Sequence, residues 1–89
     1  MAKPTSADPE IIAIGALGFL AEDPARLSRF LDMTGLSPAT LRQAASEPRF
    51  LASVLDYLMN DESLMLAFAA HHGAQPETIA AASAALARM

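Results

Sequence analysis

Apolar residues recur at helical spacing in six stretches of the chain, and each stretch begins at a start signal. In five of them a proline directly follows a polar residue, at positions 8–9, 23–24, 37–38, 47–48 and 75–76. Proline suits the first helical position, because it has no N–H to leave unbonded and its φ is already helical. Asn60 and Asp61 break the fourth stretch and start the fifth. The pattern predicts helices over residues 9–21, 24–34, 38–45, 48–59, 62–72 and 76–88.

The predicted helices differ in how far their apolar residues surround them. Residues 48–59 carry one apolar stripe, whereas residues 9–21 and 62–72 are apolar on more than one side. Much of the first helix is therefore expected to be buried, and the fifth to lie in the middle of the fold or under a partner. Connections of one to four residues join rods about 12–20 Å long. We expect an all-α fold: a compact bundle of five or six short, obliquely crossed helices, forming one domain over residues 9–89 after a frayed tail over residues 1–8.

Two glycines, Gly15 and Gly18, lie three residues apart on one side of the first helix. Glycine weakens a helix but lets another backbone come close. This spacing favours a tight helix crossing. A ligand groove beside the two glycines is the alternative.

Composition agrees with the helical pattern. Hydrophobic residues make up 53% of the 89. The chain has twenty alanines and twelve leucines, which favour helices, but nine β-branched residues, which favour strands. The chain has no cysteine, which excludes disulfides and thiolate metal sites. Its longest apolar run, residues 11–21, is too short to cross a bilayer, and acidic residues precede it where a signal peptide is positive. We expect a cytoplasmic protein without a membrane segment.

The net charge of −4 is unevenly spread. The middle of the chain is basic and is a candidate basic face, formed by Arg26, Arg29, Arg42 and Arg49. The simplest explanation is that this middle packs against the acidic ends, for example through an ion pair from Arg42 to Asp56, Asp61 or Glu62. An acidic partner is the alternative.

A longer pattern runs through most of the chain. Its residues are Phe30-Leu31, Thr34-Gly35-Leu36, Leu41-Arg42, Pro48, Phe50-Leu51, Val54-Leu55-Asp56-Tyr57-Leu58, Asp61-Glu62, Phe68-Ala69, Gly73 and Pro76. Over about residues 9–87 it resembles the family of small alphaproteobacterial proteins described as domain of unknown function DUF3572. The resemblance implies a bacterial cytoplasmic helical domain. It implies no activity, cofactor or catalytic residue.

Residues 24–45 also fit a helix-turn-helix, with residues 38–45 as the recognition helix. Nucleic-acid binding is nevertheless disfavoured, because the sequence pI is about 4.9 and this helix has one basic residue, Arg42. Leu31 also stands where such motifs need a small residue.

Catalytic and metal-binding chemistry find little support. His71 and His72 are adjacent and point about 100° apart on a helix, so one helix cannot use both to chelate one metal. Asp61 and Glu62 start a helix, where negative charge is favourable. No spaced His, Ser or Lys completes an acid–base pair or a nucleophile system. We expect no enzymatic activity, no cofactor and no metal.

Leftover apolar surface is the feature that points to a function. Phe50, Tyr57 and Met59 flank the main stripe of their helix, and Met65 lies on the helix that is apolar all round. Such surface, with methionines that adapt to a partner, is typical of binding faces. The sequence favours a protein-interaction module, with a homodimer as one form of that interaction, and it does not identify the partner.

Overall fold

The computed structural model describes residues 8–88, and within that range it contains six α-helices and no strand. They are α1 (Pro9–Ala21), α2 (Pro24–Thr34), α3 (Pro38–Ala44), α4 (Pro48–Met59), α5 (Glu62–His72) and α6 (Pro76–Ala87). The Cα radius of gyration is 12.2 Å. The predicted all-α bundle is confirmed, and α3 and α6 each end one residue earlier than the pattern indicated. The tail predicted over residues 1–8 lies outside the described residues except for Asp8.

The helix starts form as the local chemistry requires. Proline occupies the first turn of every helix but α5. The Asp8 side chain accepts hydrogen bonds from the N–H groups of Glu10 (3.0 Å) and Ile11 (3.4 Å). Ser37 and Thr40 form a reciprocal capping box at the start of α3. These bonds satisfy N–H groups that the first helical turn leaves free.

Two glycines end their helices. Gly35 follows α2 with φ 75°, and Gly73 follows α5 with φ 76°. Both lie in the left-handed region, which costs other residues free energy but suits glycine. The connections that begin with these glycines are three residues long, from α2 to α3 and from α5 to α6.

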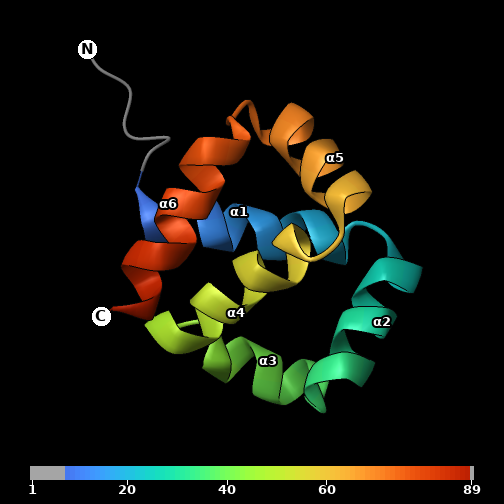
Figure 1. Ribbon diagram of the computed structural model, residues 1–89. Helices are drawn as coiled ribbons and strands as arrows, with labels where there is room; N and C mark the ends of the chain where they lie inside the picture. Colours follow the sequence, from blue (N-terminus) through green and yellow to red (C-terminus); the bar gives the residue numbers. More distant parts are fainter. Residues whose placement is uncertain (1–7, 89) are drawn as a thin grey trace.

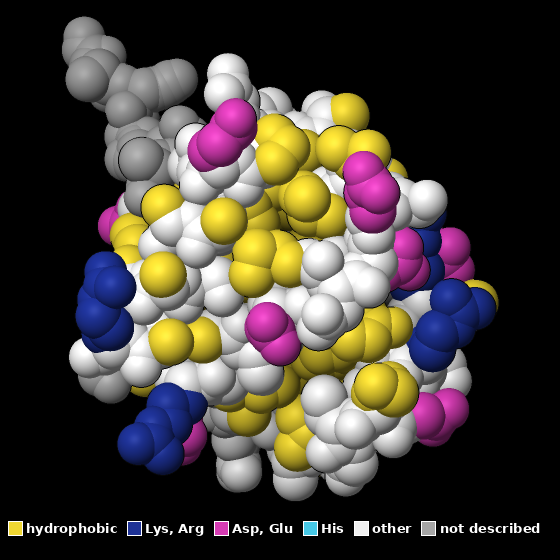
Figure 2. Space-filling model, in the orientation of Figure 1, with side chains coloured by type: hydrophobic (Ala, Val, Ile, Leu, Met, Phe, Trp, Pro, Cys, Tyr) yellow, Lys and Arg dark blue, Asp and Glu magenta, His cyan; other side chains and the backbone are white. Residues whose placement is uncertain are grey.

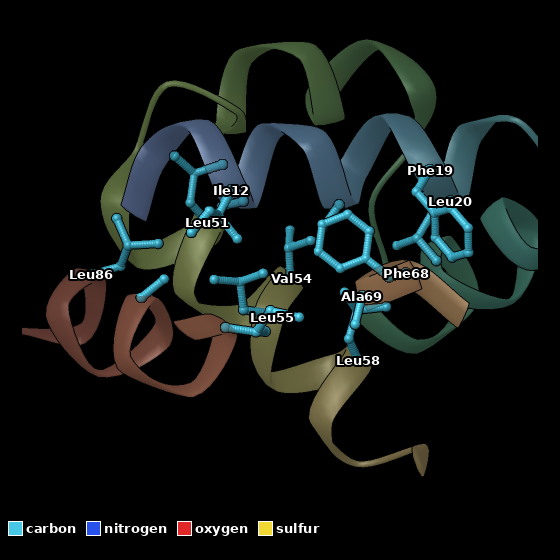
Figure 3. Packing of buried hydrophobic residues seen from close by; sticks show 14 of the residues in the cluster. Ile12, Phe19, Leu20, Leu51, Val54, Leu55, Leu58, Phe68, Ala69 and Leu86 are labelled. Carbon is cyan, nitrogen blue, oxygen red and sulfur yellow. The ribbon is translucent and has the colours of Figure 1, made fainter. Parts of the chain in front are cut away.

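The core centres on α4. In Figure 1, α4 lies in front of α1, with α5 and α6 on one side and α2 and α3 on the other. Helix α4 packs against α6, α1 and α5. Figure 3 shows Ile12, Leu51 and Leu86 at one end of this core and Phe19, Leu20 and Phe68 at the other. The large side chains with almost no exposure are Phe30, Phe68, Ile12, Leu20, Leu55, Leu58, Ile79, Leu86 and Val54.

Helix α3 is the exception to this packing. None of its seven residues, all of which the structure describes, is buried. Leu41 and Ala44 are half-buried, and the remaining residues are exposed. Because buried apolar area is the main source of stability, α3 is held to the rest of the domain more weakly than the other helices.

The two glycines of α1 have different surroundings. A Cβ placed on Gly15 would lie 2.7 Å from Cε1 and 2.9 Å from Nδ1 of His72, closer than real atoms pack. Gly15 therefore makes room for the ring of His72 on α5, and in the described part of the chain the close backbone approach expected of a tight helix crossing is not seen at either glycine. At Gly18, no described atom beyond its own helix lies within 4 Å of such a Cβ.

Candidate functional site: the outer side of α1

One side of α1 is apolar although it faces outward. The inner side packs into the core through Ile12, Ala13, Ala16, Phe19 and Leu20. On the opposite side Ile11 is 48% exposed and Ile14 is 53% exposed, and Gly18 and Ala21 are exposed in line with them. We call these four residues, Ile11, Ile14, Gly18 and Ala21, the outer face of α1. Acidic residues lie at its two ends, Glu10 and Glu22, and no polar side chain interrupts it.

The expected burial of α1 is therefore only half correct. The helix is apolar all round, but a six-helix domain of this size covers only the part of it that meets α2, α4, α5 and α6. Roughly two-thirds of the surface of so small a chain is buried on folding, so an all-apolar helix near the outside keeps an exposed strip. The sequence indicates such a strip, because it has no polar residue between Glu10 and Glu22.

A groove adjoins the outer face where α3 passes α1. It is an open hollow of about 430 Å³ lined by Ile14, Leu17, Gly18, Ala21, Pro38, Leu41, Arg42 and Ala45. We call it the α1–α3 groove. Gly18 deepens it, because a side chain at this position would occupy the open space. Of the described residues that line it, Arg42 is the one with a charge.

The residues that the sequence favoured for interaction lie elsewhere and are half-buried. The ring of Phe30 meets the rings of Phe50 and Tyr57 edge-on, with centroid distances of 6.0 and 5.1 Å. Met59 and Met65 pack against the core. Figure 2 shows hydrophobic side chains gathered at the centre of the side on which α4, α5 and α6 meet. The most exposed large apolar side chains are instead Ile11, Ile14, Met33 and Leu66.

The four arginines of the basic middle are divided among different places. Arg26 lies 4.9 Å from the ring centre of Phe19 and 3.7 Å from Asp23. Arg26 and Arg29 line a small hollow with Tyr57 and Asp61. Arg42 lines the α1–α3 groove, and Arg49 is exposed in the first turn of α4.

Among residues 8–88, no ion pair joins an arginine of this basic middle to an acidic residue distant in the sequence. The salt bridge that the arginines make within residues 8–88 is Arg26–Asp23, which is local, and Nε2 of His71 lies 3.8 Å from the carboxylate of Glu22. The expected pair from Arg42 to Asp56, Asp61 or Glu62 is not formed among these residues. The guanidinium of Arg42 is thus a positive charge beside the groove without a salt bridge among the described residues.

The two histidines pack against phenylalanines. The His71 ring lies 5.3 Å from the ring of Phe19, and the His72 ring stacks on Phe68 at 5.1 Å with an interplanar angle of 28°. No group of three His, Cys, Asp or Glu residues in the described part of the chain is arranged to hold a metal ion.

A model of a known protein family matches nearly the whole chain. A family model described as "Protein of unknown function (DUF3572)" matches residues 6–88. The chain belongs to the DUF3572 family. No curated protein and no solved structure matches it. Among the described residues of this DUF3572 member, no helix is long and apolar enough to cross a bilayer.

Proposed function

We propose that this DUF3572 chain is a non-catalytic protein-interaction domain of the bacterial cytoplasm. Its binding surface is the outer face of α1 together with the α1–α3 groove, and its ligand is an apolar helix of another protein chain. The observation that carries the proposal is the pair Ile11 and Ile14, each about half exposed on a helix side without a polar residue. Helices with one apolar side typically bind in grooves of this kind.

The energetics favour covering this surface. Full burial of an isoleucine side chain is worth about 1.5–3 kcal/mol, so covering the exposed halves of Ile11 and Ile14 contributes about 2 kcal/mol before the groove is counted. Leu17 and Leu41 line the groove and add to this. Isolated exposed leucines and isoleucines are ordinary, but a continuous strip beside a hollow is typical of a binding surface.

Nucleic-acid binding through α3 is the alternative. Its exposed residues would have to contact bases or phosphates, but the chain carries a net charge of −4 and α3 supplies one arginine. The four arginines also do not line one common hollow, since Arg26 and Arg29 line one and Arg42 lines another. Phosphate contacts provide most of the affinity for nucleic acid, so we favour the protein ligand. Retardation of DNA or RNA at low salt that Arg42→Ala abolishes would favour the alternative.

A photo-crosslinking residue placed at Ile14 tests the proposal in cells. The matched control carries the same residue at Met33 of α2, which is 71% exposed and lies outside the outer face of α1. We expect one discrete protein adduct from position 14 and none from position 33. A Gly18→Gln change in the position-14 chain should remove the adduct, because the new side chain fills the groove. Equal labelling from both positions, or an adduct that persists after the Gly18→Gln change, would refute the proposal.

A further inference from the structure

We infer that the helix bound on the outer face is α1 of a second copy of this chain, so that the surface is the interface of an antiparallel, two-fold homodimer. The inference rests on the proposed function and names its partner. It is carried by the order of large and small residues along the outer face and by the charges beside it.

The outer face is complementary to itself when two copies run antiparallel. About a two-fold axis next to residue 16, position 14 of one copy lies opposite position 18 of the other, and position 11 lies opposite position 21. Each large side chain then meets a small residue: Ile14 covers Gly18, and Ile11 covers Ala21. A two-fold interface requires this kind of self-complementarity. In a parallel pair Ile14 would meet Ile14, and the space at Gly18 would remain empty.

The open space at Gly18 lies where the antiparallel arrangement needs room for Ile14 of the second copy. No described atom beyond its own helix approaches the point where a Cβ would stand, so the monomer itself gives no packing reason for glycine there. An exposed glycine inside a helix costs about 1 kcal/mol relative to alanine. Close approach of a second helix, carrying Ile14 into the hollow, is a reason for the glycine that the monomer lacks.

The positive charge of Arg42 supports the same partner. Arg42 lines the groove and has no salt bridge among the described residues, whereas α1 carries a carboxylate at each end of its outer face. A second α1 therefore brings both the isoleucine that fills the hollow and an acidic residue for the arginine. The same register also places Glu10 of one copy opposite Glu22 of the other, and this pair of like charges weakens the dimer.

The dimer should be weak. One short helix and part of a groove bury less than about 1,200 Å² in total, which is the size range of transient interfaces. We expect a Kd on the order of 100 µM, so that self-association shows at about 1 mM and is lost on dilution to about 10 µM.

Sedimentation of the purified full chain from about 10 µM to about 1 mM tests the inference. The average mass should rise toward twice that of the monomer. Ile14→Asp and Gly18→Ile should each weaken self-association at least tenfold, whereas Met33→Asp, on α2, should leave it unchanged. The double variant Ile14→Gly/Gly18→Ile exchanges the large and small positions and should restore the dimer, because position 18 again meets position 14. Circular dichroism establishes that each variant is folded.

The outcomes separate the two proposals. A wild-type chain that stays monomeric at about 1 mM overturns the homodimer, and the proposed function then stands or falls on the crosslink from position 14 to a different protein. Self-association that Ile14→Asp abolishes but the double variant does not restore overturns the antiparallel pairing. Self-association unaffected by Ile14→Asp overturns the interface on α1.

Discussion

Adding one methyl group at Gly15 or at Gly18 should have different effects on stability, although both positions lie in the interior of α1. Replacing glycine by alanine inside a helix gains about 0.5–1 kcal/mol, since alanine loses less backbone freedom on folding. At Gly18 the new Cβ meets no described atom beyond its own helix, so the whole gain is expected. Gly18→Ala should raise Tm by about 4 °C.

At Gly15 the same gain is opposed by the ring of His72. The new Cβ would lie 2.7 Å from Cε1, so the ring has to turn away. Turning it disrupts the stack on Phe68, and an aromatic pair of this kind is worth about 0.5–1.5 kcal/mol. The two effects nearly cancel or leave a net loss, and Gly15→Ala should be less stable than Gly18→Ala by about 1 kcal/mol.

Urea and thermal unfolding of both variants at about 10 µM, where self-association contributes little, measure this difference. His72→Ala supplies the control, because without the ring Gly15→Ala should stabilise the domain as much as Gly18→Ala does. The double-mutant cycle should then give a coupling energy of about 1 kcal/mol between positions 15 and 72. Equal stabilisation by both alanines in the wild-type background, or no coupling in the cycle, would refute the assigned roles of the two glycines.

The packing and the caps give three more predictions. Phe30→Ala should cost about 3–5 kcal/mol in chemical unfolding, since the ring is fully buried between two aromatic neighbours; a loss below about 1 kcal/mol would contradict this packing. Asp61→Ala should cost about 1 kcal/mol because its side chain accepts a hydrogen bond from Leu64 N–H at 3.2 Å, whereas Glu47→Ala, which removes no cap, should cost nearly nothing; equal losses would show that the caps are unimportant. In hydrogen exchange, the amides of α3 (Pro38–Ala44) should exchange faster than those of α4, because α3 has no buried residue among its described seven; equal protection would refute the weak attachment of α3.

Local chemistry was enough to predict where the six helices begin and to place their ends to within one residue. A proline after a polar residue, or Asp61 alone, satisfies or removes the free N–H groups of the first turn within a few residues. Gly35 and Gly73 end helices for a reason that is equally local, a left-handed φ. Such interactions depend on residues three or four positions apart, so the sequence alone determined the six rods and, with their lengths and connections, the all-α bundle.

Which side of each rod is covered depended on contacts between distant residues. Helix α1 is apolar all round, so its sequence contains no signal for which side faces the core. The exposure of Ile11 and Ile14 appears only once α2, α4, α5 and α6 cover the rest of the helix. The same holds for Gly15 and Gly18, which are alike in sequence and differ because the ring of His72 reaches one of them. The tertiary structure therefore decided where the binding surface can lie, because burial is a property of the neighbours that a helix meets rather than of its own residues.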